Sequence, residues 1–429
     1  MKRRTLLRAG LAAGGALGAL GLLKPGNAGA PHARYFADME RLLQRDGPGT
    51  ACLILDLDRL NHNLIALRDA MPPGKAYRLV SKSLPCASLI DHVLAAMRSR
   101  RIMCFHQPFA NALARSFPDA DLLVGKPMPV EAVARFYDDH RPGRFDPQSQ
   151  LQWLVDTPQR LARYANLARA RGVRLRISIE IDVGLHRGGV DNDADFLTML
   201  RMLRDDSRHL RFGGLMGYDP HVVRLPDLMG DADALQQAAN ARYRHFIALL
   251  RRHGGDLLTL QQDPPLVFNG AGSPNFVLHD ERAPTNDLAV GSALVKPADF
   301  ALPTLAAFRP ALWIAAPVLK VADGVELPGL EWASLPARLW NPNLQRTHFI
   351  YGGNWRADSV SPQGLSTNAL FGRSSNQEML TGAAASALAP GDWVFHRPRQ
   401  SEALMLQFAE ILVVQAGGVV DHWPVLTTT

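Results

Sequence analysis

The sequence predicts an α/β protein in which a (β/α)₈ TIM-type barrel is followed by a mostly β C-terminal domain. Over residues 50–297, eight short apolar runs alternate with segments whose apolar residues recur about every 3.6 positions, as in parallel strands joined by helices. From residue 298 to residue 429, short apolar runs separated by prolines and glycines replace these helical periods. The 429 residues are enough for a barrel of roughly 250 residues and a second domain.

Each expected barrel strand is a short run of mainly apolar residues. The eight runs are Tyr77–Val80, Ile102–Phe105, Asp121–Val124, Leu151–Val155, Leu175–Asp182, Phe212–Tyr218, Leu266–Asn269 and Leu288–Val290. Amphipathic segments with a helical period lie between them, including Arg59–Ala70, Pro85–Met97, Val130–Asp138, Pro158–Ala170 and Ala232–Arg252. This regular alternation favours a closed barrel of parallel strands.

One further strand, Cys52–Asp56, precedes the barrel and needs a partner outside it. The C-terminal domain offers apolar runs of strand length at Ala311–Leu319, Phe349–Tyr351, Trp393–Phe395 and Ile411–Val414. Residues 31–49 and the strand after them are therefore expected to join this domain.

The first 30 residues have the three-part layout of an export signal. Residues 1–8 contain four basic side chains, residues 9–23 are apolar, and Ala28-Gly29-Ala30 supplies the small residues of a cleavage site. The paired Arg3 and Arg4 are similar to those of a twin-arginine signal. A membrane anchor is the alternative, but the apolar run of about 15 residues is shorter than the ~20 that a bilayer requires. We therefore expect cleavage after Ala30, a periplasmic location and a mature protein without a membrane partner.

Charge and cysteine content argue against a nucleic-acid-binding protein, a disulfide-stapled protein and a zinc protein with thiolate ligands. The formal net charge is +7, but the first 30 residues carry five basic side chains and no acidic one, which leaves 42 basic against 40 acidic residues in the rest. No basic run there indicates a nucleic-acid partner. Cys52, Cys86 and Cys104 are odd in number and include no C-x-x-C pair, which argues against a disulfide framework or a thiolate zinc site.

Lys82 is the first candidate for chemistry. The motifs of nucleotide-binding loops, zinc proteases and α/β-hydrolases are absent from the sequence. Only seven of the 47 basic residues are lysines, and Lys82 follows the expected strand Tyr77–Val80, at the strand end where barrel enzymes keep their catalytic groups. A primary amine there can form a Schiff base, whereas a guanidinium cannot. By position alone, a solvated surface lysine is the alternative.

Three more segments place polar residues and glycines at strand ends. Residues 178–190 read Ser-Ile-Glu-Ile-Asp-Val-Gly-Leu-His-Arg-Gly-Gly-Val, and residues 214–221 end in Tyr-Asp-Pro-His. Residues 269–275 read Asn-Gly-Ala-Gly-Ser-Pro-Asn, and their glycines favour a backbone nest for a phosphate group.

Taken in order, these segments resemble the fold-type III pyridoxal-phosphate enzymes, the alanine-racemase-like barrels, and more closely their D-threonine aldolase and D-serine dehydratase branch. Residues 51–58 are similar to the T-P-x-x-x-x-D start of that branch. Arg78 and Lys82 match its Arg-x-x-x-Lys motif, and residues 180–190 match its E-x-D-x-G-x-x-R-x-G-V segment. The resemblance extends over residues 50–424 and implies a barrel over residues 50–297 that binds pyridoxal 5′-phosphate.

The resemblance also implies a role for each candidate residue. Lys82 would hold the cofactor as an aldimine, Arg187 would lie near its phenolate oxygen, and Tyr218 near its phosphate or the substrate. His221 is a further catalytic candidate. The alternatives are a salt bridge for Arg187, a core position for Tyr218 and a structural role for His221. The phosphate cradle would be formed by Gly270, Gly272 and Ser273.

The chain departs from this branch at its metal site. Members of the branch place a His-x-Cys or His-x-Asp pair in the C-terminal domain, whereas the matching positions here are Gln400 and Glu402. A neutral amide is a poor ligand for a transition metal, and one carboxylate binds it weakly. A divalent metal is therefore not expected, unless His396 and His422 serve as ligands instead.

Together these interpretations predict a pyridoxal-phosphate-dependent lyase that acts on a small D-amino acid, as a D-threonine aldolase does. A metal-independent amino-acid racemase is the first alternative, with Lys82 as one acid/base group and Tyr218 or a residue of a partner subunit as the other. The second is a cofactor-binding protein that lost turnover, which Gln400 and Glu402 favour and the otherwise complete cofactor set opposes. A small amino acid is the expected partner, and a homodimer is considered as the assembly.

Overall fold

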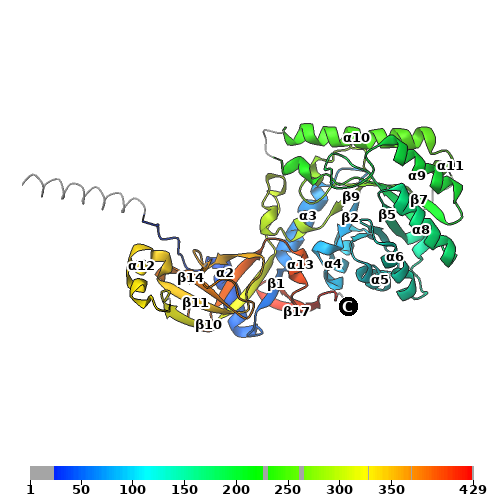
Figure 1. Ribbon diagram of the computed structural model, residues 1–429. Helices are drawn as coiled ribbons and strands as arrows, with labels where there is room; N and C mark the ends of the chain where they lie inside the picture. Colours follow the sequence, from blue (N-terminus) through cyan, green and yellow to red (C-terminus); the bar gives the residue numbers. More distant parts are fainter. Residues whose placement is uncertain (1–23, 226–229, 260–264, 327, 369, 428–429) are drawn as a thin grey trace, which may run out of the picture. The chain divides into compact units, whose positions relative to one another are not determined.

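The computed structural model describes residues 24–225, 230–259, 265–326, 328–368 and 370–427 (Figure 1). Residues 1–23 of the expected export signal lie outside the described residues. Contacts within the chain separate two compact units, which we describe one at a time. The barrel unit comprises residues 55–312, 399–413 and 421–429, and the β unit comprises residues up to 54, 313–398 and 414–420.

The two units do not separate at residue 298, where the sequence suggested a boundary. Residues 298–312 stay with the barrel unit because hydrogen bonds fold them back onto the segment after its last strand. The Lys296 Nζ donates to the carbonyl oxygens of Leu305 (2.7 Å) and Phe308 (2.8 Å). The Ala311 N–H donates to the carbonyl oxygen of Val295.

The barrel unit contains a closed barrel of eight strands, each parallel to its neighbours. They are β2 (Ala76–Val80), β3 (Arg101–Cys104), β4 (Asp121–Val124), β5 (Leu151–Val155), β6 (Leu175–Glu180), β7 (Leu210–Met216), β8 (Val267–Gly270) and β9 (Asp287–Val290). This confirms the predicted fold class. β6 and β7 end two residues earlier than the sequence suggested, so Asp182 and Tyr218 belong to the loops above the barrel.

Helices alternate with these strands, as the periodicity predicted. They are α3 (Leu57–Ala70), α4 (Ala87–Met97), α5 (Gln107–Ser116), α6 (Val130–Asp139), α7 (Pro147–Gln150), α8 (Pro158–Arg171), α9 (Asp193–Asp205), α10 (Ala232–His253) and α11 (Asp256–Thr259). α8 shows the local reason: the Thr157 side chain accepts the N–H of Arg160, Pro158 begins the first turn, and Gly172 ends the helix with φ at 63°.

Two layers of side chains fill the barrel. The lower layer is charged and buried: the Arg78 Nε lies 2.7 Å from the Asp287 Oδ1, and its guanidinium also donates to Asp121. The upper layer is apolar and supports the pocket described below. It is formed by Val80, Met103, Leu123, Leu154, Met216 and Ala289. The barrel is therefore a packed core and not a channel.

The second sheet has nine strands, which confirms a mostly β second domain. Its main path runs β13 (Ser366–Thr367), β14 (Gln377–Gly382), β11 (Arg346–Tyr351), β10 (Leu312–Asp323), β1 (Cys52–Asp56), β16 (Glu410–Gln415) and β17 (Gly418–Pro424). β15 (Trp393–Pro398) pairs with β10 and with β12 (Ala357–Ser361). The strand that precedes the barrel thus lies between β10 and β16.

Residues 34–46 form α2 (Arg34–Asp46), which packs on the β unit through aromatic side chains. The Trp313 Nε1–H donates a hydrogen bond of 2.9 Å to the Tyr35 hydroxyl. The ring of Phe36 lies 4.9 Å from that of Trp313 and 5.1 Å from that of Phe395. These contacts bury the apolar face of the helix against the strands.

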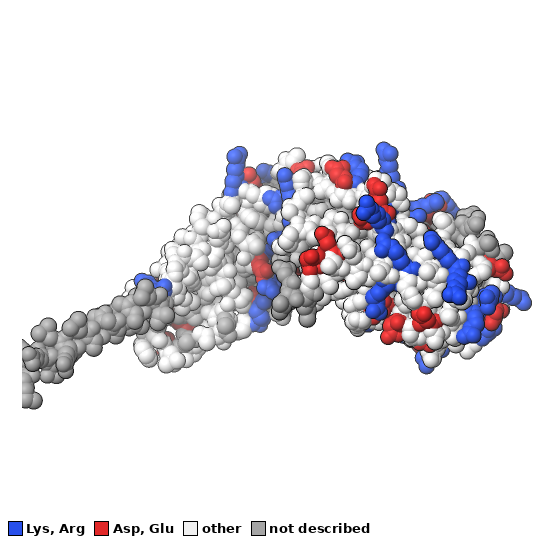
Figure 2. Space-filling model, turned by 90° about the horizontal axis from the view of Figure 1, so that it is seen from above, with Lys and Arg blue, Asp and Glu red and all other residues white. Residues whose placement is uncertain are grey.

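Charged side chains are intermixed on the surface. On the face shown in Figure 2, Lys and Arg side chains lie among Asp and Glu side chains. Exposed ion pairs of the barrel unit include Arg144–Asp119 and Arg169–Asp206. Within the described part of the chain, no helix has both the length and the apolar character needed to cross a bilayer.

Candidate active site

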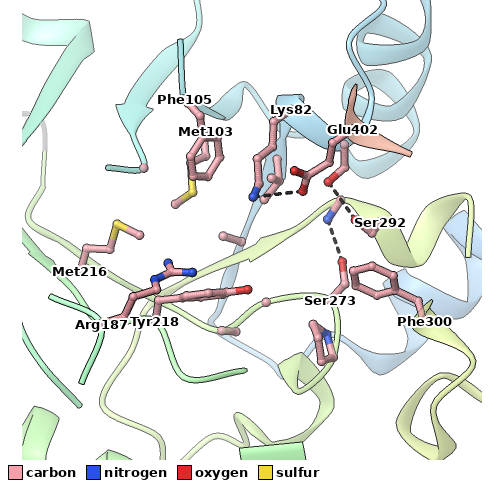
Figure 3. Close-up of a pocket in the computed structure, with 18 residues that line it drawn as sticks. Lys82, Met103, Phe105, Arg187, Met216, Tyr218, Ser273, Ser292, Phe300 and Glu402 are labelled. Carbon is pink, nitrogen blue, oxygen red and sulfur yellow. Dashed lines mark hydrogen bonds and ion pairs between the residues drawn. The ribbon is translucent and has the colours of Figure 1, made fainter. Parts of the chain in front are cut away.

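A pocket opens where the barrel strands end, and Lys82 lies within it (Figure 3). About 550 Å³ of space between atoms, part of it open to solvent, is enclosed by loops that follow β2, β3, β6, β7, β8 and β9. Its apolar lining includes Met103, Phe105, Met216 and Phe300.

Lys82 is presented by a single tight turn. β2 leads into a 3₁₀ turn, η1 (Ser81–Ser83), which turns the lysine side chain away from the strand and into the pocket. The Lys82 Nζ lies 3.0 Å from the Glu402 Oε1 and 4.6 Å from the centre of the Phe105 ring. With 40% of its side chain exposed, the amine remains accessible to a ligand.

Arg187 and Tyr218 enter the pocket from neighbouring loops, after β6 and β7. The Arg187 guanidinium lies over the Tyr218 ring, with 4.9 Å between the Cζ and the ring centre. Asp182 shapes the loop that carries Arg187, because its Oδ1 accepts the N–H groups of Gly184 (2.8 Å) and His186 (3.1 Å). Burial raises the pKa of Tyr218 although Arg187 opposes the shift, so this phenol stays protonated at neutral pH.

Small residues and hydroxyl groups gather at the other end of the pocket. The Ser273 Oγ accepts the N–H groups of Gly291 (3.2 Å) and Ala293 (3.0 Å), and the Ser83 and Ser292 hydroxyls are 2.9 Å apart. A Cβ at Gly272 would lie 2.9 Å from the Tyr218 ring, and one at Gly291 would lie 2.8 Å from the carbonyl oxygen of Val80. Glycine therefore allows the close backbone approach on which this end of the pocket depends. The hydroxyl groups gathered here suit a phosphate group.

A buried polar cluster holds the glycine-rich loop 270–275 from behind. The Asp219 Oδ2 lies 2.9 Å from the His279 Nε2 and accepts a hydrogen bond of 2.9 Å from Gln236. Gln236 in turn accepts from the Asn275 amide, and the Asn275 Oδ1 accepts the N–H of Gly272 (3.1 Å). Burial works against ionisation of Asp219, but the neighbouring His279 and the amide donors hold its pKa below the usual value. The loop position is thus fixed by charge-assisted hydrogen bonds.

Glu180, the last residue of β6, is a carboxylate near the site with a strongly raised pKa. Burial, reinforced by the negative charge of Asp156, raises its pKa to about 7 even though Arg187 and Arg160 oppose the shift. The side chain does not line the pocket, so its effect on Arg187 is electrostatic.

The pocket brings together most of the residues predicted from the sequence. Lys82, Arg187, Tyr218, Gly272 and Ser273 all line it. The roles implied for them by the resemblance stay predictions.

Two predicted site residues lie outside the pocket lining. Gly270 ends β8 on the far side of the loop, where a Cβ would lie 2.6 Å from the Thr285 methyl group. His221 lies in the 3₁₀ turn η2 (Pro220–Val223), and its Nε2 faces Gly184. Its Nδ1 is buried without a hydrogen-bond partner among the described residues, and burial lowers its pKa. Tyr218 lines the pocket, whereas His221, three residues later, belongs to this 3₁₀ turn and faces Gly184, a difference that position after a strand does not predict.

The positions matched to a metal pair make other contacts. The Gln400 amide donates to the Asp299 Oδ2 (3.2 Å), and Glu402 pairs with Lys82. His396 contacts the Ser359 hydroxyl, and His422 contacts Glu410. No group of three or more His, Cys, Asp or Glu side chains suited to a metal occurs among the described residues. These donors do not fit a transition-metal site, which takes three or four such ligands.

Sequence reasoning missed several contributors to the pocket, among them Gly291, Ser292 and Glu402 as a partner of Lys82. Gly291 and Ser292 follow β9, so the strand-end rule that singled out Lys82 would have found them. Glu402 lies 320 positions after Lys82 in the printed sequence, and no local pattern relates the two.

The residues that line the pocket fit pyridoxal phosphate. A primary amine stands at a strand end for the aldehyde, hydroxyl groups and close-packed glycines form one end for the phosphate, and Arg187 supplies a cation beside Tyr218. Below them, the apolar layer of the barrel offers a water-free floor for a ring.

The comparisons with known proteins agree with this geometry. The sequence matches the family model described as alanine racemase, N-terminal domain, over residues 55–298, which is more than half of the chain. It is 25% identical to 3-hydroxy-D-aspartate aldolase of Paracoccus denitrificans over 255 residues, 58% of this chain and 61% of the relative. The match thus spans less than two thirds of that relative's length.

Solved structures show the same fold at lower sequence identity. D-threonine aldolase from Filomicrobium marinum is 19% identical, with a TM-score of 0.66 over 88% of this chain and 97% of that one. D-threo-3-hydroxyaspartate dehydratase from Delftia sp. HT23 is 19% identical, with a TM-score of 0.64 over 90% and 99%. Alanine racemase from Bacillus anthracis is 13% identical, with a TM-score of 0.65 over 87% and 97%. The chain belongs to the family of the alanine racemase N-terminal domain, and so to the fold-type III pyridoxal-phosphate enzymes.

Proposed function

We propose that this protein is a pyridoxal-phosphate-dependent lyase that cleaves a small D-β-hydroxy amino acid, as a D-threonine aldolase does. The observation that carries the proposal is the Lys82 amine, which stands at the end of β2 in a pocket with Arg187, Tyr218 and a cradle of glycines and hydroxyl groups. The similarity to an aldolase of hydroxy-D-aspartate and to the fold of a D-threonine aldolase supports this reaction class.

Each pocket residue has a role in this proposal. Lys82 would hold the cofactor covalently, Arg187 would face its ring oxygen, and Ser273 with Gly272 and Gly291 would bind its phosphate. When bound, the cofactor supplies an electron sink for cleavage of a bond at the substrate Cα. The protein contributes orientation, exclusion of water by the apolar floor, and proton transfer at the Lys82 Nζ.

The experiment that tests the proposal is a product assay on the purified holoenzyme. D- and L-isomers of threonine, serine, 3-hydroxyaspartate and alanine are incubated separately, and products are followed by NMR. An aldehyde together with glycine indicates an aldolase, a 2-oxo acid together with ammonia indicates a dehydratase, and the enantiomer indicates a racemase. Formation of neither aldehyde nor 2-oxo acid from any isomer would contradict the lyase proposal.

A racemase is the second candidate, favoured by the position of two acid/base groups. Lys82 follows β2 and Tyr218 follows β7, and Figure 3 shows their side chains entering the pocket from different sides. Racemisation needs a proton donor and a proton acceptor on the two faces of the substrate Cα. Enantiomer formation from D-alanine, abolished by Tyr218→Phe, would favour this candidate, and a protein that lost turnover would give no product at all.

We further propose that turnover is independent of a divalent metal, because Gln400 is bound to Asp299 and Glu402 to Lys82. Dialysis against a chelator should leave the cleavage rate unchanged. Metal analysis of the purified protein provides the independent readout. One tightly bound divalent ion per chain, lost together with activity, would contradict this proposal.

Export to the periplasm and assembly as a homodimer complete the proposal. Replacing Arg3 and Arg4 by lysine keeps the charge but removes the paired guanidinium groups, so the double variant should stay in the cytoplasm. Residues 26–30 contact the β unit through Asn343 and Gln363, and cleavage after Ala30 would remove these contacts. Mass spectrometry of the exported chain shows whether it is cleaved after Ala30. Light scattering of the purified protein measures whether it is a dimer.

A further inference from the structure

We propose that Glu402 is the proton acceptor for the substrate's β-hydroxyl group and that it returns this proton to Lys82. The inference rests on the proposed lyase function and adds a residue to it. Cleavage of a β-hydroxy amino acid needs a base at the hydroxyl group, and the donors at the metal positions do not form a metal site that would supply one.

The geometry favours Glu402 because it carries the one carboxylate among the described residues that line the pocket. Its Oε1 lies 3.0 Å from the Lys82 Nζ, and 37% of its side chain is exposed, so a substrate group can reach it. No histidine lines the described pocket. Tyr218 lines it too, but burial raises its pKa, which makes it a proton donor and a poor acceptor at neutral pH.

The segment before Glu402 is anchored by two hydrogen bonds within the barrel unit. The Asp299 N–H donates to the carbonyl oxygen of Arg399 (3.1 Å), and the Gln400 amide donates to the Asp299 Oδ2 (3.2 Å). Glu402 then begins the short turn α13 (Glu402–Met405). These bonds hold the carboxylate at the pocket, and Gln400 has the role of a positioning residue.

Glu402 and Lys82 together can accept and return every proton that the cleavage moves. The β-hydroxyl proton moves to the Glu402 carboxylate, the Cα–Cβ bond breaks, and the hydroxyl oxygen becomes the carbonyl oxygen of an aldehyde. The electron pair of the broken bond would stay at Cα. Lys82, released from the cofactor when the substrate amine takes its place, would then give an ammonium proton to Cα and complete glycine. Protonated Glu402 then gives its proton to the neutral Lys82 amine across the 3.0 Å contact, so no proton is gained or lost in a turnover.

The test compares holoenzymes with and without this carboxylate, in the presence of a chelator. Glu402→Gln should lower kcat for cleavage of a D-β-hydroxy amino acid by about 10²–10⁴-fold, the usual contribution of a general base. Exchange of the glycine α-protons in D₂O needs a base at Cα and no base at a hydroxyl group, so it should fall far less than cleavage.

Glu410→Gln is the matched control, because Glu410 is a glutamate of the same C-terminal region that contacts His422 outside the pocket. It should cleave and exchange as the unaltered protein does. Equal cleavage by Glu402→Gln and the unaltered protein, an equal loss of cleavage and exchange, or loss of cleavage with chelator alone would each overturn the inference. An unaltered protein that exchanges glycine but cleaves no β-hydroxy amino acid would instead overturn the proposed function, and this is visible before any variant is made.

Discussion

The Arg78 guanidinium and the Asp287 carboxylate form a fully buried ion pair inside the barrel, with 2.7 Å between Nε and Oδ1. Arg78 is four residues before Lys82 on the chain, and its strand, β2, is hydrogen-bonded to the strand of Asp287, β9. The pair therefore fixes the strand that presents the reactive amine. Arg101 adds a second contact to Asp287, also at 2.7 Å.

We predict that Arg78→Ala lowers the free energy of unfolding by on the order of 3 kcal/mol, because it leaves Asp287 buried with one cationic partner fewer. Urea unfolding followed by circular dichroism measures the effect. Arg144→Ala removes an exposed pair with Asp119 and should cost less than about 1 kcal/mol. Similar losses of unfolding free energy in the two variants would show that the buried ion pair stabilises the fold no more than the exposed pair.

Lys82→Ala should abolish covalent attachment of the cofactor and the visible absorption that accompanies it. Borohydride reduction of the unaltered holoenzyme followed by peptide mapping should place the adduct on Lys82. Lys126→Ala is the control, since that residue does not line the pocket. An adduct on Lys126 or Lys296 would contradict the assignment.

Glu180→Gln should change the pH dependence of stability in the cofactor-free protein. Burial raises the pKa of Glu180 to about 7 in the folded state, above its ordinary value of 4.5, so the unfolded chain loses this proton first as pH rises. The free energy of unfolding of the unaltered protein should therefore fall between pH ~4.5 and ~7, by on the order of 2 kcal/mol, whereas Glu180→Gln escapes this loss.

Unfolding at pH 5 and at pH 8 measures this difference. The advantage of Glu180→Gln should be small at pH 5 and larger at pH 8, with Glu131→Gln as a control for the replacement of a glutamate by an amide on the exposed side of α6. An advantage that is equal at both pH values would contradict the prediction.

Asp219→Asn should weaken cofactor binding, although Asp219 does not line the pocket. Asp219 is buried behind the loop 270–275 and holds it through His279 and Gln236. Loss of the charge weakens these hydrogen bonds, and we expect the Kd of the cofactor to rise about 10-fold, a cost of roughly 1.4 kcal/mol. Spectroscopic titration of the apoprotein measures it, and an unchanged Kd would show that the loop needs no such support.

Substrate charge should matter because Glu402 faces the reactive amine. A second carboxylate on the substrate, as in 3-hydroxy-D-aspartate, would be brought near the Glu402 carboxylate and repelled. We expect kcat/KM for D-threonine to exceed that for 3-hydroxy-D-aspartate by about 10-fold, and Glu402→Gln should reduce this ratio through KM. The opposite preference in the unaltered protein would contradict the prediction.

The sequence alone determined the barrel, because hydrophobic periodicity is local. Each strand or helix is encoded by one short run of consecutive residues, and burial on one or both faces imposes the pattern. The same reasoning predicted that Lys82 follows the first barrel strand, and in the structure it lies in the turn directly after β2. Residues 31–49 were assigned to the β domain for lack of another sheet, and α2 packs there.

Only the tertiary structure decided which loops meet above the barrel. His221 and Tyr218 are three residues apart, yet His221 faces Gly184 and Tyr218 lines the pocket, since a 3₁₀ turn begins between them at Pro220. The contact between Lys82 and Glu402 joins distant segments whose approach depends on how residues 399–413 return to the barrel unit. Such pairings arise from packing and long-range hydrogen bonds, which leave no periodic signal in the chain.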